Sequence, residues 1–155
     1  RLAQTFDVLQ QAFAQRLIAV RREHPMFRRR RFLTGESPMG SGVPDVWWFR
    51  RDGMRMTPHN WHHEDAGVLG VFLNGSEIRS STPHGERVID DSFLVLLNAS
   101  PEQVAFRLPA RRFGARWTIE LATDQPQLRS GTGVFRAHTE IAVEARSLTL
   151  LRRSA

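Results

Sequence analysis

Residues 68–75 read Val-Leu-Gly-Val-Phe-Leu-Asn-Gly, an apolar run that ends in an Asn-Gly pair. A short apolar run of this length, closed by a turn signal, is typical of a buried strand. Asn-Gly favours the two-residue type I′ turn of a β-hairpin, because both positions tolerate positive φ. We therefore expect a strand over residues 68–73, followed at once by a hairpin turn at Asn74-Gly75.

The same pattern of short apolar runs between turn residues continues to the C-terminus. The predicted strands are residues 46–49, 68–73, 93–97, 104–108, 117–121, 134–137, 140–143 and 148–151. Strands at a spacing of roughly ten residues, with no helix between them, are typical of antiparallel sandwiches and barrels. The expected fold is mainly β, an antiparallel β-sandwich.

Residues 5–23 have a helical pattern instead. Apolar residues recur at three- and four-residue steps at Phe6, Leu9, Phe13, Leu17 and Val20. We expect Thr5 to cap this helix and Pro25 to end it near His24. Residues 32–45, rich in Gly, Ser and Pro, are predicted to form a loop that leads to the sheet. The apolar stripe of a lone helix needs a surface to cover it, on the sandwich or on a neighbouring domain.

Length and composition bound the class of protein. The chain has 155 residues, enough for one domain, and 41% of them are hydrophobic, which is typical of a globular protein with a core. No apolar run is long enough to span a bilayer, so no membrane partner is expected. The chain has no cysteine, which excludes disulfide scaffolds and cysteine-based zinc sites and suits the reducing cytoplasm.

The positive charge lies at one end of the chain. All 22 basic residues are arginine, and residues 1–31 carry the whole net charge of +6. The run Arg28 to Arg31 could bind nucleic acid by releasing phosphate counterions. It is short, however, and no aromatic platform of an RNA-binding motif accompanies it. We interpret it as a solvated or domain-docking segment and expect no nucleic acid; a basic nucleic-acid-binding protein is an alternative.

Two groups of side chains could carry chemistry. The metal-like group is His59, His62 and His63 with Glu64 and Asp65. Its order differs from the His-Glu-x-x-His of zinc hydrolases, and Pro58 places it at a turn. The adjacent pair Asp90-Asp91 would diverge in an extended chain, whereas glycoside hydrolysis needs two carboxylates that face each other. We expect no metal, no cofactor and no catalytic residue in this chain.

Three tryptophans are the candidate substrate-binding residues: Trp47, Trp48 and Trp61. Their flat, amphipathic rings can stack on sugars. The alternative is a core role, since alternation along a strand would bury one of Trp47 and Trp48. A stand-alone carbohydrate-binding β-sandwich is therefore a further alternative for the whole chain.

Seven phrases, taken in order, resemble the C-terminal region of bacterial glycogen debranching enzymes, which are isoamylase-type hydrolases of glycoside hydrolase family 13 in the α-amylase superfamily. They are RLIAVRREHP (16–25), FRRRRFL (27–33), GSGVPDVWW (40–48), DGMRMTPHNW (52–61), LGVFLNG (69–75), ERVIDDSFLVLLN (86–98) and RSLTLLR (146–152). A trehalose-pathway debranching enzyme of the same subfamily fits equally well. The chain departs from the family at Pro58, His59 and Asn60, where the phrase before Trp61 is usually acidic.

The resemblance implies that residues 1–31 are the last helix of a catalytic (β/α)₈ barrel with its connecting segment, and that residues 32–155 are the C-terminal β-sandwich. It implies a parent enzyme that hydrolyses α-1,6 branch linkages in glycogen and maltooligosaccharides with carboxylates of that barrel. The chain starts at Arg1 without Met, so we interpret it as an inactive fragment. Its expected partners are the missing barrel, branched α-glucan through the parent, and a second copy through the uncovered helix.

Overall fold

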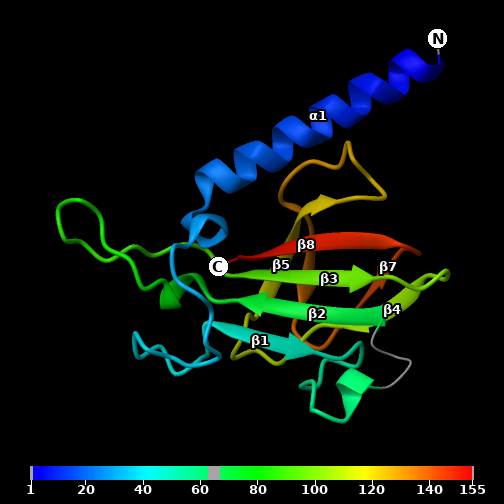
Figure 1. Ribbon diagram of the computed structural model, residues 1–155. Coiled ribbons are helices and arrows are strands. Elements are labelled where there is room, and N and C mark those ends of the chain that lie inside the picture. The colour runs from blue at the N-terminus through cyan, green and yellow to red at the C-terminus, as the bar shows by residue number, and fades with distance from the viewer. Residues whose placement is uncertain (1, 63–66, 155) are drawn as a thin grey trace.

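The computed structural model describes residues 2–62 and 67–154. Within these ranges the chain forms one α-helix and eight strands (Figure 1). The helix α1 (Leu2–Glu23) is followed by the 3₁₀ turn η1 (Pro25–Arg28). The strands are β1 (Val46–Phe49), β2 (Val68–Leu73), β3 (Phe93–Asn98), β4 (Val104–Arg107), β5 (Arg116–Ala122), β6 (Thr132–Arg136), β7 (Glu140–Val143) and β8 (Ser147–Ser154).

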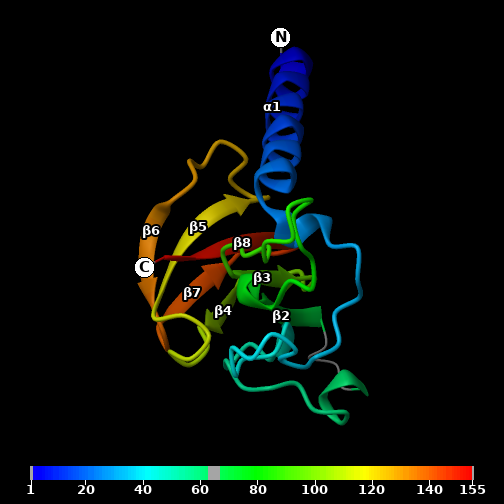
Figure 2. The same ribbon diagram turned by 90° about the vertical axis from the view of Figure 1, so that its left-hand side faces the viewer.

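The strands form two antiparallel sheets that pack face to face (Figures 1 and 2). Six strands make the large sheet, in the order β1-β2-β3-β8-β5-β6, and β4 pairs with β7 in the small one. The main core lies between them, where Phe72 and Leu94 of the large sheet meet Phe106 of β4 and Val143 of β7. The prediction of a mainly β, antiparallel sandwich after one N-terminal helix is confirmed.

The side chains of β2 alternate between the inner and the outer face of the large sheet. Val68, Gly70 and Phe72 are buried, whereas the residues between them are half-buried on the outer face of the sheet. Gly70 lies where the ring of Phe106 packs, because a Cβ at Gly70 would come within 2.6 Å of the Phe106 Cζ atom. The small residue in the run therefore lets the two sheets approach each other.

Local patterns placed most elements correctly. Each of the eight predicted strands is present, and α1 ends at Glu23, just before His24 and Pro25. The prediction that Thr5 caps the helix is wrong, because α1 already begins at Leu2. Residues 2–4, Leu-Ala-Gln, are all good helix formers, so the helix continues on the N-terminal side of Thr5.

The hairpin predicted at Asn74-Gly75 is also wrong. β2 and β3 are antiparallel neighbours, but the chain leaves β2 through the 3₁₀ turn η4 (Gly75–Glu77) and a long connection. Gly75 is not among the glycines with positive φ, which a type I′ turn requires. It is needed for a close backbone approach instead, since a Cβ there would lie 2.1 Å from the carbonyl oxygens of Asp90 and Asp91.

The C-terminal half of α1 rests on the outer face of the large sheet, and its N-terminal turns extend beyond the strands (Figures 1 and 2). A second core forms at this contact, where Val20 and Met26 meet Phe93 and Leu121. Arg16 adds a hydrogen bond from its guanidinium to the main-chain carbonyl of Glu120. Within the described residues, α1 is not apolar enough to cross a membrane, and no other helix is long enough.

Candidate functional site

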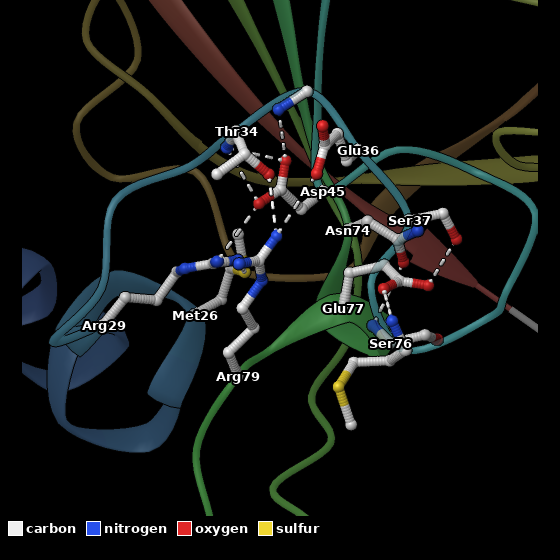
Figure 3. Close-up of polar contacts among 12 residues, drawn as sticks. Met26, Arg29, Thr34, Glu36, Ser37, Asp45, Asn74, Ser76, Glu77 and Arg79 are labelled. Carbon is white, nitrogen blue, oxygen red and sulfur yellow. Dashed lines mark hydrogen bonds and ion pairs between the residues drawn. The ribbon is translucent and has the colours of Figure 1, made fainter.

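Three carboxylates hold the segment that we call the joint, residues 24–45 between α1 and β1. The side chains of Asp45 and Glu77 are fully buried, and that of Asp90 is 7% exposed. Figure 3 shows the first two, with the loop backbone wrapped around them. Buried charges are rare unless they are paired or hydrogen-bonded, so the partners of these three groups define what they do.

Asp45 fastens the middle of the joint. Its carboxylate accepts hydrogen bonds from the main-chain N–H groups of Thr34 and Gly35, at 3.1 and 2.8 Å. It also pairs with the guanidinium of Arg29 at 3.3 Å. Burial lowers the pKa of Arg29; the Asp45 charge opposes this shift and the charge of Arg79 adds to it. The arginine run is therefore not uniformly solvated, because one member is drawn into the fold.

Glu77 fastens the next loop of the joint. One oxygen accepts from the Ser37 hydroxyl and the Ser41 N–H, both at 2.8 Å, and the other accepts from the Met39 N–H at 2.6 Å. Burial alone would raise the pKa of Glu77, but these hydrogen bonds outweigh it and hold that pKa below its ordinary value. Glu77 is therefore ionised at neutral pH and acts as an acceptor for the loop.

Asp90 fastens the start of the joint. It lies 2.8 Å from the Nδ1 atom of His24, and its second oxygen accepts from the Met26 N–H at 2.8 Å. Among the described residues, His24, Asp90 and Asp91 form the one group whose ligand atoms lie close enough for a metal. Both Asp90 oxygens already accept hydrogen bonds, and Asp91 is an exposed partner of Arg152. We therefore interpret the contacts of Asp90 with His24 and Met26 as an anchor that fixes the end of α1 to the sheet.

The apolar stripe of α1 is only partly covered. Val20 is buried and Phe13 is half-buried, but Leu17 is 43% exposed. Val8 and Ile18 are also exposed, but the helical period places both away from this stripe. The side chain of Phe6 lies outside the part of the chain that is described.

A hollow of about 250 Å³ continues this apolar surface between α1 and the outer face of the large sheet. Leu17 and Phe27 line it from the helical side, and Leu121, Leu148 and Leu150 line it from the strands. The helix and the sheet therefore share one uncovered apolar face.

The three candidate tryptophans separate into two environments. Trp47 is half-buried against Phe113, and the guanidinium of Arg55 lies 4.2 Å from its ring centre. Trp48 and Trp61 are 40% and 43% exposed, and their rings meet edge to face with centres 5.5 Å apart. The structure thus brings two of the three together, one from β1 and one from the 3₁₀ turn η2 (Asn60–His62).

A hollow of about 390 Å³ is lined by residues that are neighbours of these two tryptophans in the sequence. Its polar side chains include those of Arg50, Asp52 and Asn60. His59 also lines it, on the side of η2. His62, the next member of the metal-like group, is the last residue of η2. The other three members, His63, Glu64 and Asp65, lie outside the described residues.

Sequence reasoning missed the three anchoring carboxylates. The one local signal is that Asp45 and Glu77 each precede a residue that is buried, Val46 and Ile78 respectively. An acidic residue against an apolar run is common at strand ends, so this signal alone does not distinguish a buried anchor from an exposed charge.

The chain is thus a β-sandwich domain preceded by an amphipathic helix. Part of the apolar face of that helix is uncovered and could contact a neighbouring domain. Residues 45–152 match the family model described as isoamylase, C-terminal, and the chain belongs to this family. The resemblance to the C-terminal region of isoamylase-type debranching enzymes is confirmed.

Two groups of relatives are similar to nearly the whole chain. It is 40% identical over 145 residues to the glycogen operon protein GlgX homolog of Mycobacterium tuberculosis, which is 92% of this chain and 20% of that relative. It is 27% identical over 149 residues to an isoamylase of a Flavobacterium species, 91% of this chain and 18% of that relative. The chain spans about a fifth of the length of these relatives.

Proposed function

We propose that this chain is the non-catalytic C-terminal part of a debranching enzyme that hydrolyses α-1,6 linkages in glycogen or maltooligosaccharides. Residues 1–31 belong with the catalytic barrel, and residues 32–155 form the appended sandwich. Family membership and the names of the relatives, a glycogen operon protein and an isoamylase, support this proposal. The absence of cysteine from the chain suits a cytoplasmic enzyme.

The observation that carries the proposal is the uncovered apolar face of α1 and the sheet. Burying a large aliphatic side chain is worth about 1.5–3 kcal/mol, so an exposed residue on this face such as Leu17 favours a covering surface. The joint holds α1 against the sheet through His24 and Asp90, which would give a covering barrel one fixed orientation relative to the sandwich. In this arrangement the sandwich braces the barrel, and the barrel supplies the chemistry.

The 155-residue chain is expected to release no linear chains from a branched α-glucan, whereas the intact protein that contains it releases them. The reason is that the proposal places the catalytic carboxylates in the barrel, whereas Asp45 and Glu77 accept hydrogen bonds from loop N–H groups. A reducing-end assay on glycogen measures both. Release of linear chains by the isolated chain would contradict the assignment.

A helix-face variant links this experiment to the structure. Leu17→Asn is expected to lower the thermal stability of the intact enzyme, because the barrel loses an apolar contact with this face. In the isolated chain the same face would join two copies, and the variant should then shift sedimentation towards the monomer. Gln15→Asn, at an exposed position of the same helix, is the matched control and should change neither measurement. A wild-type chain that stays monomeric at high concentration would count against this use of the face.

A second function rests on a different observation, the exposed pair of Trp48 and Trp61 near a polar hollow. We propose that this pair contacts the glucan that the parent enzyme degrades. An exposed aromatic face covers the apolar side of a sugar ring, while the polar groups of Arg50 and Asp52 can bond to its hydroxyls. Trp47 is not part of this pair, because it packs towards the core against Phe113 and under the guanidinium of Arg55.

Replacing either Trp48 or Trp61 by alanine is expected to weaken maltooligosaccharide binding about tenfold, the equivalent of one aromatic contact of about 1.4 kcal/mol. Tryptophan fluorescence titration and retardation in glycogen-containing gels measure the affinity. Phe32→Ala is the matched control, because Phe32 is an aromatic residue that is 96% exposed and lies in the joint. Unchanged affinity in both tryptophan variants, or an equal loss in Phe32→Ala, would remove this surface from consideration.

A further inference from the structure

A basic hollow of about 640 Å³ lies between η1, the start of the joint and the connection that follows η4. Five arginines line it, Arg28, Arg29, Arg30, Arg31 and Arg79, together with the hydroxyl residues at positions 80–82. We call it the arginine hollow. It is separate from the apolar face of α1 and from the tryptophan pair, so neither proposed function accounts for it.

The positive charge of the arginine hollow is only partly compensated. Arg29 is paired with the buried carboxylate of Asp45, and Arg79 lies 3.8 Å from the exposed carboxylate of Glu36. In the part of the chain that the structure describes, no carboxylate pairs with the other three arginines. Folding therefore gathers cations around a concave surface and leaves an excess of positive charge there.

One donor in the wall of the arginine hollow has no partner. Arg79 donates from Nη2 to the Thr34 hydroxyl at 3.0 Å, but its Nε atom is buried without a hydrogen bond. Figure 3 shows its guanidinium beside that of Arg29, with both on one side of Asp45. Buried donors without a partner are uncommon in folded proteins, and this one holds the Arg79 charge in place without an acceptor of its own. The exposed part of the Arg79 side chain, 29% of it, is what a ligand in the hollow can reach.

We propose that the arginine hollow binds a small molecule through a phosphate group, as in a sugar phosphate or a nucleoside diphosphate. Guanidinium groups bind phosphate oxygens in bidentate fashion, and hydroxyl groups add further donors. Ile78 and Val88 provide an apolar floor beside these donors, which suits the ring of a sugar or a base. The volume lies in the range of about 300–1,000 Å³ that is typical of small-molecule sites.

A compact anion suits the charge distribution better than a nucleic acid. Outside residues 1–31 the arginines are balanced by an equal number of carboxylates, so the excess of positive charge is concentrated near the hollow. Nucleic acids are bound along extended rows of cations, whereas a concave cluster surrounds one group.

Calorimetric titration of the 155-residue chain at low ionic strength tests the proposal, with inorganic pyrophosphate, glucose 6-phosphate and ADP as separate probes. Pyrophosphate and at least one of the two esters should bind in a one-to-one ratio. Tighter binding of glucose 6-phosphate than of ADP identifies a sugar phosphate as the source of the group, and the reverse identifies a nucleotide. Arg28→Gln and Arg31→Gln should each weaken binding about tenfold, because each removes one charge-assisted contact.

The matched control is Arg129→Gln, which removes one exposed arginine from the connection between β5 and β6. It should leave the affinity unchanged, and circular dichroism should show all three variants folded. The proposal is overturned if none of the three probes binds, or if Arg129→Gln weakens binding as much as the variants in the hollow. It is also overturned if a short DNA duplex binds more tightly than pyrophosphate with a steep dependence on salt.

Discussion

Replacing Glu77 with glutamine is expected to lower the free energy of unfolding by about 3 kcal/mol and to loosen the joint, since the charged acceptor of several buried hydrogen bonds is lost. Both oxygens of Glu77 are used, by Ser37, Met39 and Ser41. Glutamine keeps the length of the side chain but presents an amide N–H₂ to N–H donors. Urea unfolding measures the loss, and amide hydrogen exchange at Met39 and Ser41 locates it.

Glu36→Gln is the control for the Glu77 variant. Glu36 lies in the same segment, but its carboxylate is 76% exposed and 3.8 Å from Arg79. An exposed pair of this kind is worth about 0–1 kcal/mol, so the control should unfold close to the wild type. Equal effects of the two substitutions would show that Glu77 does not hold the loop.

The pH dependence of stability follows from the same group. Because the pKa of Glu77 is lower in the folded chain than in the unfolded one, its contribution to stability is complete above the unfolded value of about 4.3. It is lost as the pH falls from there through the folded pKa. The wild type should therefore lose more stability than Glu77→Gln over this acidic window. Parallel unfolding curves of the two proteins across it would contradict this explanation.

Gly75→Ala is expected to destabilise the chain by about 3 kcal/mol, at the upper end of what overpacking costs. The added Cβ would lie 2.1 Å from two main-chain oxygens, those of Asp90 and Asp91, and backbone atoms cannot rotate aside. The strand entry must then shift, and Asp90 moves with it. Hydrogen exchange at Met26, whose N–H bonds to Asp90, should accelerate along with the fall in thermal midpoint.

Gly67→Ala provides the matched control for Gly75→Ala. Among the residues that the structure describes, a Cβ at Gly67 meets only the Ala99 Cβ, at 4.0 Å, and the φ of Gly67 is not in the left-handed region. The substitution should change stability by less than about 1 kcal/mol. A Gly75→Ala protein as stable as this control would show that the connection between β2 and β3 does not pack against Gly75.

The strands were predictable because their signal is local. Alternation and apolar runs, bounded by Gly, Pro or Asn, are decided within a few residues, and the eight predicted segments required nothing else. The prediction of a hairpin at Asn74-Gly75 was wrong because it used only neighbouring residues, whereas the path of the chain there depends on distant ones. Asn74 and Gly75 fit a tight turn by type, but the backbone of Asp90, far along the chain, occupies the space beside them and determines the path.

The candidate site was less predictable than the fold, for the same reason. Trp48 and Trp61 could be named by residue type, but their edge-to-face contact depends on how the chain returns from β1 to η2. The carboxylates of Asp45 and Glu77 are bound mainly by main-chain N–H groups. Because almost every residue has such a group, the residue types do not show which of them will bind a carboxylate. Within the arginine run, only the fold reveals that Arg29 turns inward to Asp45, while its neighbours pair with no carboxylate among the described residues.

The anchoring carboxylates have a practical consequence for exchanging this sandwich between relatives. Asp90 and Glu77 belong to the connection between β2 and β3, whereas their donors His24 and Met39 lie before β1. A chimaera spliced inside residues 24–45 would combine the donors of one relative with the acceptors of another, which were never optimised for each other. A crossover point placed within α1 keeps both halves of each contact on the same inherited piece.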